Sequence, residues 1–220
     1  MISRALASLT STHEVLGLLP TETSQLVAEG CFHGKSTDVQ NDLPLLWTIT
    51  RLLEPTSIIE LGVRHGITSR TLAHAAMQYG GTVYGYDPDP RCAFYLQELF
   101  KNGDYDYHFE AITGEQAWEK LHPQIIGSGG VDMLMIDTDP HTREQTRGWL
   151  ETWVLQGLAP GGVAVFHDIV PAREEIQVEA AILDFLCSSH IKATEWVYRR
   201  FPTPGPYQYQ YGLGLLWRLQ

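Results

Sequence analysis

The sequence predicts an α/β fold built on a doubly wound, mostly parallel β-sheet, and three observations support this prediction. From residue 56 onward, short apolar runs rich in β-forming residues alternate with longer segments of helical character. The runs are too continuously apolar to have one exposed side, which indicates strands covered by helices on both faces. The last two strand-like runs are joined by a segment too short to hold a helix, so they should pair antiparallel.

The individual elements follow from these patterns in chain order. An amphipathic helix that ends before Pro55 is expected over residues 43–53. Five runs are expected to form the parallel strands, at residues 57–61, 82–86, 107–112, 131–136 and 162–166. Crossover helices are expected between them at residues 67–78, 91–101, 115–121 and 143–158, where apolar residues recur near helical spacing. The antiparallel pair is expected at residues 193–199 and 209–218.

Length and composition indicate one principal domain. The chain has 220 residues, of which 44% are hydrophobic, enough to bury a large single core. Residues 42–220 are predicted to form this domain, and residues 1–41 an N-terminal arm or lid. The three cysteines are widely scattered, so neither a disulfide framework nor a zinc site is expected.

The charge balance excludes some classes of partner. The formal net charge of -11 has the wrong sign for neutralising the phosphates of DNA or RNA. No run approaches the 18 apolar residues of a membrane span, and the first residues lack the apolar segment of a signal peptide. We therefore predict a cytoplasmic protein without nucleic-acid or membrane partners.

A glycine turn follows the first predicted strand. That strand ends in Glu60, and the sequence Gly62-Val63-Arg64-His65-Gly66 then opens a helix. Glycines let the backbone approach a ligand closely, and a helix N-terminus offers free N–H groups. The spacing matches neither GxGxxG nor a phosphate loop, so pyrophosphate binding is disfavoured. The alternative is a tight turn that binds no ligand.

A carboxylate closes the second predicted strand. Asp87 occupies the position from which an acidic side chain can bind both hydroxyls of a ribose. The alternative is a surface turn formed by Asp87-Pro88-Asp89-Pro90. Together with the glycine turn, Asp87 indicates a cofactor that contains a nucleoside.

Acidic residues and histidines follow the fourth and fifth predicted strands. Because the carboxyl ends of parallel strands open on one crevice, we expect these side chains to lie close together. The carboxylates of Asp137 and Asp168 could bind Mg²⁺, and His141 or His167 could take a proton from a substrate hydroxyl. The alternatives are a helix cap for Asp139 and packed or solvated histidines.

From about residue 43 to its end, the chain resembles the class I S-adenosylmethionine-dependent methyltransferases. The glycine turn, the acidic end of strand two, the turn Thr113-Gly114-Glu115-Gln116-Ala117 and the segment Leu158-Ala159-Pro160-Gly161-Gly162 occur in the order of that family. The resemblance implies a Rossmann-like, seven-stranded sheet. It also implies that a C-terminal strand, here residues 211–218, inserts antiparallel between strands five and six.

The resemblance implies a site for S-adenosylmethionine. It places Glu60 at the amino acid of the cofactor, Asp87 at the ribose and Glu115 at the adenine. The residues implied to contact the cofactor are Glu60, Gly62, Val63, Arg64, Gly66, Asp87, Gly114, Glu115, Gln116 and Asp137.

The segments around Asp137 and Asp168 are similar to the small O-methyltransferase branch, which includes enzymes acting on antibiotic sugars and relatives of catechol O-methyltransferase. This similarity implies that Asp137 and Asp168 are ligands of Mg²⁺. Two departures from the catechol-type pattern leave the use of metal open. Ile169 stands where those enzymes have a ligating Asn, and Pro140 adds a residue before His141.

The implied reaction transfers the sulfonium methyl group to a hydroxyl of a small molecule, such as a natural product or a sugar. Alignment of donor and acceptor would supply part of the rate, and His141 or His167 would act as base, with Asp137 beside them. A homodimer is also expected, because dimers are the commonest oligomers. The alternatives that stay open are N- or C-methyl transfer, transfer of an aminopropyl group on the same fold, and an inactive protein that binds the cofactor as a scaffold.

Aromatic residues near the expected crevice would suit a sugar or a polycyclic acceptor. They are Trp149, Trp153, Tyr207, Tyr209 and Tyr211. The alternative is that they pack in the core or in the C-terminal hairpin.

Overall fold

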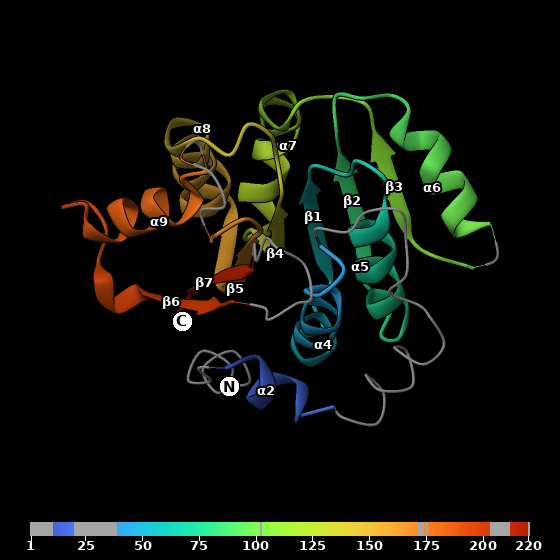
Figure 1. Ribbon diagram of the computed structural model, residues 1–220. Helices are drawn as coiled ribbons and strands as arrows, with labels where there is room; N and C mark the ends of the chain where they lie inside the picture. The colour runs from blue at the N-terminus through green and yellow to red at the C-terminus, as the bar shows by residue number, and fades with distance from the viewer. Residues whose placement is uncertain are drawn as a thin grey trace.

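The computed structural model describes residues 11–19, 39–101, 103–170, 174, 176–202 and 212–219. These residues form one seven-stranded sheet in the order β3-β2-β1-β4-β5-β7-β6, which confirms the predicted α/β class (Figure 1). The strands are β1 (Ser57–Leu61), β2 (Thr82–Tyr86), β3 (Tyr107–Glu110), β4 (Val131–Ile136), β5 (Leu158–Phe166), β6 (Trp196–Phe201) and β7 (Leu213–Arg218).

The strand pairing is parallel except at the C-terminal edge. Strands β1 to β5 pair in parallel, and β7 pairs antiparallel with both β5 and β6. The predicted antiparallel insertion of the C-terminal strand is therefore confirmed. Strand β1 has β2 on one side and β4 on the other, so the order in which strands are added to the sheet reverses at β1. Such a reversal places a crevice at the carboxyl ends of these strands.

Helices cover both faces of the sheet. They are α2 (Thr12–Leu16), α4 (Leu43–Leu53), α5 (Ile67–Met77), α6 (Cys92–Phe100), α7 (Gly114–Ser128), α8 (Arg143–Trp149), the π-helix η1 (Leu150–Gly157) and α9 (Val178–Cys187). Trp153 of η1 packs with Leu134 in one buried cluster, and Leu72 of α5 packs with Met133 in another. Leu134 and Met133 are neighbours in β4, so successive side chains of one strand face opposite layers. Both faces of the sheet are buried, as predicted.

Several boundaries differ from the predicted ones. The helix expected over 115–121 runs on to Ser128, because its stop is Gly129, which has the left-handed φ of 93° that ends many helices. The helix expected over 143–158 is divided into α8 and the π-helix, and β5 begins at Leu158 rather than at residue 162. Strand β3 ends at Glu110, two residues early.

The segment after β5 contains α9, which was not predicted. Its buried residues Val178, Ala181, Ile182 and Phe185 nevertheless recur at helical spacing. The strand expected over 193–199 begins at Trp196, after the 3-10 turn η2 (Ala193–Glu195). The tyrosines at positions 207, 209 and 211 lie outside the described residues.

Only part of the predicted N-terminal arm is described. Val15 of α2 is buried against residues of α4, including Leu45 and Ile49. Most of residues 1–41 lie outside the described part, so the division at residue 41 stays a prediction. In the described part, no helix combines the length and the apolar character that a membrane span needs.

Candidate active site

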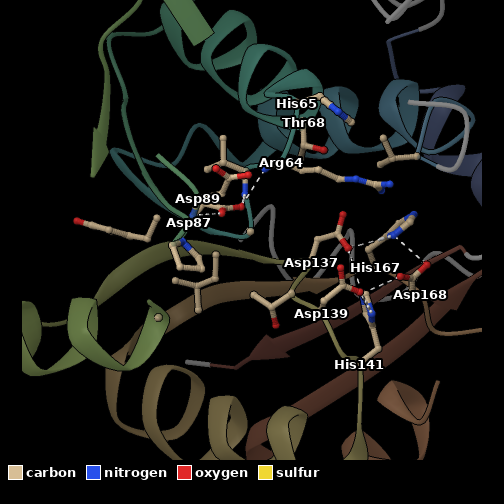
Figure 2. Close-up of a pocket in the computed structure, with 18 of the residues that line it drawn as sticks. Arg64, His65, Thr68, Asp87, Asp89, Asp137, Asp139, His141, His167 and Asp168 are labelled. Atoms are coloured by element: carbon tan, nitrogen blue, oxygen red, sulfur yellow. Dashed lines mark hydrogen bonds and ion pairs between the residues drawn. The ribbon is translucent and has the colours of Figure 1, made fainter. Parts of the chain in front are cut away.

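A crevice of about 680 Å³ opens at the carboxyl ends of β1, β2, β4 and β5 (Figure 2). Its wall is formed mainly by residues 61–65, 67–68, 86–89, 137–141 and 167–168, together with Val39, Gly114 and Ile176. Figure 2 shows Asp87 and Asp89 in one part of the crevice and the group formed by Asp137, His141, His167 and Asp168 in another. The volume lies in the usual range of small-molecule sites.

The glycine turn brings β1 and β4 together. Gly62 has a φ of 91°, and a Cβ atom there would lie 1.9 Å from the backbone oxygen of Asp137. No side chain fits in that space, so the turn requires glycine. Gly66, with a φ of 74°, directly precedes α5. The turn therefore lines the crevice with backbone at the N-terminus of a helix.

Asp87 holds the glycine turn in place. Its Oδ2 accepts hydrogen bonds from the backbone N–H of Val63 at 2.9 Å and of Arg64 at 3.0 Å. Its Oδ1 accepts from the N–H of Asp89 at 2.8 Å. Arg64 has a left-handed φ of 50°, so these bonds also stabilise a backbone conformation that is rare outside glycine. Asp87, Val63 and Arg64 all line the crevice, where the sequence predicted them.

Glu60 lies behind the turn rather than on the wall of the crevice. The carboxylate is fully buried and accepts hydrogen bonds from Ser69 Oγ at 2.6 Å and Tyr107 Oη at 2.9 Å. Burial raises the pKa of Glu60 to about 8, against the opposing effect of these two bonds. The structure thus links Glu60 to α5 and β3, and its predicted contact with the cofactor stays untested.

The start of α7 contributes one residue to the wall. Thr113 Oγ1 accepts from the N–H of Gln116, and Gln116 Oε1 accepts from the N–H of Thr113, which is a capping box. Gln116 is therefore engaged in the cap, and Glu115 is exposed, whereas Gly114 lines the crevice. A Cβ atom on Gly114 would lie 2.7 Å from Trp149.

The two tryptophans in this region pack in the core. Trp149 is buried and its Nε1 donates to Thr138 Oγ1 at 2.9 Å. Trp153 is fully buried and donates to the backbone oxygen of Gly114 at 3.2 Å. For both residues the core-packing alternative is therefore the correct one.

Three predicted residues converge where β4 and β5 end. His141 Nε2 lies 2.8 Å from Asp168 Oδ2 and 3.4 Å from Asp137 Oδ1. Each of the three side chains offers a ligand atom, and these atoms lie within 4.8 Å of one another. Asp139 is exposed but approaches His141 Nδ1 to 3.1 Å. The sequence predicted that these residues would meet, and they do.

The charges of this cluster are interdependent. Burial alone would lower the pKa of His141, but the carboxylates of Asp137 and Asp168 outweigh burial and raise it to about 10. Burial likewise opposes the charge on Asp137, but His167 and His141 hold the pKa of that carboxyl below its usual range. An imidazolium therefore lies between two carboxylates at neutral pH.

His167 lies deeper than His141. Its side chain is 3% exposed, against 14% for His141. His167 Nδ1 lies 3.1 Å from Asp168 Oδ1 and 3.4 Å from Asp137 Oδ1, and its Nε2 lies 3.3 Å from Asp42 Oδ2. Of the two histidines predicted as bases, His141 is thus the one with more access to the crevice.

Some residues of the site were missed in the sequence. Thr68, Tyr86 and His65 line the crevice, and Asp42 contacts His167 from the start of α4. Thr68 and His65 adjoin the glycine turn, so their position in the motif was a usable signal. No local sequence signal marked Asp42, because its contact with His167 arises only when α4 packs against the end of β5.

The cluster of Asp137, His141 and Asp168 fits a divalent cation. Two carboxylates offer the oxygen ligands that Mg²⁺ prefers, and both aspartates are among the residues predicted to bind metal. A ligand must release its proton to bind a metal, so a cation here competes with the proton on His141. Ile169, 1% exposed, adds no ligand atom.

The sheet order, the glycine turn after β1 and the carboxylate after β2, all at one crevice, define an S-adenosylmethionine-dependent methyltransferase of class I. A family model described as a methyltransferase domain matches residues 59–169, which is half of the chain. The chain therefore belongs to this family. A search of curated protein sequences finds no match to it.

Solved structures share the fold at low sequence identity. An O-methyltransferase from Bacillus cereus in complex with SAH is 15% identical, with a TM-score of 0.65, covering 90% of this chain and 89% of that one. The O-methyltransferase TomG from Streptomyces achromogenes, involved in tomaymycin synthesis and solved with SAM, is 18% identical, with a TM-score of 0.59 and coverage of 91% and 89%. A methyltransferase from Podospora anserina bound to SAH is 15% identical, with a TM-score of 0.57 and coverage of 91% and 96%.

Proposed function

We propose that this methyltransferase moves the methyl group of S-adenosylmethionine to a hydroxyl of a small molecule, such as a natural product or a sugar. The observation that carries the proposal is the cluster of Asp137, His141 and Asp168, which shares one crevice with the glycine turn. Structural similarity to proteins described as O-methyltransferases supports the choice of oxygen as acceptor.

The cofactor would lie along the glycine turn. Gly62 adds no side chain to this part of the wall, and Val63 and Arg64 line it, whereas Gly66 faces Leu96 of α6. Asp87, already hydrogen-bonded to the turn, would also accept hydrogen bonds from the ribose hydroxyls, since a carboxylate has about four acceptor sites. Gly114 would approach the cofactor from the start of α7, where Glu115 is exposed and Gln116 caps the helix.

The acceptor hydroxyl would bind at the carboxylate cluster, in line with the methyl group. Asp168 would accept the N–H of His141 Nε2 at 2.8 Å and so orient the ring, and the other ring nitrogen, Nδ1, would take the proton of the hydroxyl. Because Asp137 and Asp168 raise the pKa of His141 to about 10, the imidazolium must first lose its Nδ1 proton. Asp137 and Asp168 would hold Mg²⁺, which when bound lowers the pKa of a coordinated hydroxyl. His167, with its two ring nitrogens facing carboxylates, would hold the cluster in shape.

Thermal unfolding with added ligands tests the cofactor. We expect S-adenosylhomocysteine at about 100 times its dissociation constant to add about 2.7 kcal/mol, which is about 5 to 10 °C in Tm for a chain of this size. NAD and ATP should give no shift, and each ligand is tested with and without Mg²⁺. A shift with NAD or ATP alone would overturn the cofactor assignment.

The variant Asp168→Asn tests the proposed catalytic role of the carboxylate cluster. It should lose methyl transfer while its affinity for S-adenosylhomocysteine stays within about twofold of wild type, because Asp168 orients His141 and lies away from the glycine turn. Wild-type turnover in this variant would remove the cluster from the mechanism. Tight cofactor binding by the wild-type protein without turnover on any hydroxylated acceptor would support the scaffold alternative.

A homodimer and a cytoplasmic location stay predictions beside this proposal.

A further inference from the structure

Asp42 is a buried carboxylate with no part in the reaction as described so far. It lies directly before α4 and its side chain is 2% exposed. Many aspartates at this position cap the helix with a side-chain hydrogen bond, but Asp42 makes no such bond. Its Oδ2 lies instead 3.3 Å from His167 Nε2, and that side chain is 3% exposed. The carboxylate therefore faces the histidine rather than its own helix.

Burying charges so completely is costly unless they are paired. The opposite nitrogen of His167, Nδ1, faces Asp168 Oδ1 at 3.1 Å and Asp137 Oδ1 at 3.4 Å. The imidazole thus lies between Asp42 on one side and the crevice cluster on the other. Because an imidazole has only two ring nitrogens, a carboxylate on one of them fixes the orientation of the other.

We propose that Asp42 is a positioning residue for methyl transfer. It holds the ring of His167 so that Nδ1 stays between Asp137 and Asp168. The ring thereby keeps these two carboxylates in the position where the acceptor hydroxyl would bind. Asp42 is not among the described residues that line the crevice, so it acts through His167. This inference rests on the proposed function for its catalytic consequence, and on geometry alone for the orientation of the ring.

Nuclear magnetic resonance of the histidine rings tests the orientation without any acceptor. In protein labelled with ¹⁵N-histidine, Asp42→Asn should shift the ring resonances of His167 and also those of His141, which the cluster of carboxylates connects to it. The matched control is Asp132→Asn, because Asp132 is a carboxylate whose Oδ2 contacts another segment of the chain, through the backbone N–H groups of Thr56 and Ser57, away from the crevice wall. The control should leave both histidines unchanged. Unchanged resonances in Asp42→Asn would overturn the proposal.

Kinetics tests the catalytic consequence. With any hydroxylated acceptor that wild type methylates, Asp42→Asn should lower kcat about 10- to 100-fold, the usual cost of losing a supporting residue of this kind. KM for S-adenosylmethionine should stay within about twofold, because the glycine turn is untouched. Asp132→Asn should keep the wild-type kcat. If wild type methylates no acceptor, the proposed function fails, whereas the resonance test still decides the role of Asp42.

A double variant covers the case in which Asp42→Asn does not fold because Nε2 of a buried imidazole loses its carboxylate. Asp42→Asn combined with His167→Gln removes both partners, and it is compared with His167→Gln alone. If Asp42 acts through His167, the two proteins should have the same kcat within about twofold. A further drop of tenfold in the double variant would show that Asp42 acts by another route and would overturn the proposal.

Discussion

Gly62 is the position in the glycine turn where one added methyl group should be strongly destabilising. Its φ of 91° is unfavourable for any other residue, and a Cβ atom would lie 1.9 Å from the backbone oxygen of Asp137. We expect Gly62→Ala to lower the free energy of unfolding by at least about 3 kcal/mol, since strain and overlap add. Urea denaturation measures this loss, and binding of S-adenosylhomocysteine should weaken with it.

The matched control is Gly127→Ala in α7. A Cβ atom there meets no heavy atom within 4 Å, and the position lies inside a helix. The substitution should stabilise the protein by about 0.5 to 1 kcal/mol, because alanine loses less backbone entropy than glycine in a helix. Equal effects of the two substitutions would contradict the account of the turn.

Glu60 should make stability depend on pH. The pKa of Glu60 is about 8 in the folded protein, whereas its ordinary value, which applies to the unfolded chain, is 4.5. Between these two pH values the folded state therefore binds more protons than the unfolded state. The stabilisation is therefore complete below pH 4.5 and is lost as the pH rises toward 8. In Glu60→Gln this dependence should disappear, so the difference in unfolding free energy between wild type and variant should change steadily from pH 5 to pH 8. If the unfolding free energies of the two proteins changed in parallel with pH across this range, Glu60 would be ionised throughout.

At the scale of single elements, the N-terminus of α7 links local structure to the crevice. Thr113→Ala removes the side-chain acceptor of the capping box and should cost about 1 kcal/mol in unfolding free energy. Because Gly114 follows directly and lines the crevice, affinity for S-adenosylhomocysteine should also fall. Thr113→Ser keeps the hydroxyl and should retain both properties. Loss of affinity in the serine variant would mean that the threonine methyl group, not the cap, matters.

Elements were predictable from the sequence to the extent that their signals are local. Strands buried on both faces leave continuous apolar runs, so all five parallel strands were found. Helix α9 was missed although Val178, Ile182 and Phe185 carry its period, since the segment lies outside the regular alternation. Residues at strand ends, such as Asp87 and Asp168, were found because topology alone brings those ends together. The contacts of Glu60 with Tyr107 and of Asp42 with His167 depend on packing between distant segments, which no local pattern records.

At the scale of the whole molecule, the C-terminal strand completes the sheet beside β5, which leads to the carboxylate cluster. Strand β7 lies between β5 and β6, and five of its six residues are buried. Without it, β5 would lose its hydrogen-bonding neighbour on one side, and β5 is the strand that leads to His167 and Asp168. A chain ending at residue 211 should therefore lack a cooperative unfolding transition and bind no S-adenosylhomocysteine.

The control for this truncation keeps the strand and removes the contacts of one side chain. Arg218 Nη1 donates to the backbone oxygen of Leu158 at 2.6 Å, and Arg218→Ala should cost about 1 to 2 kcal/mol while leaving a single cooperative transition. Circular dichroism during urea denaturation measures both proteins. If the truncated chain unfolded cooperatively and still bound S-adenosylhomocysteine, the sheet would not need β7 for its stability, and this prediction would be wrong.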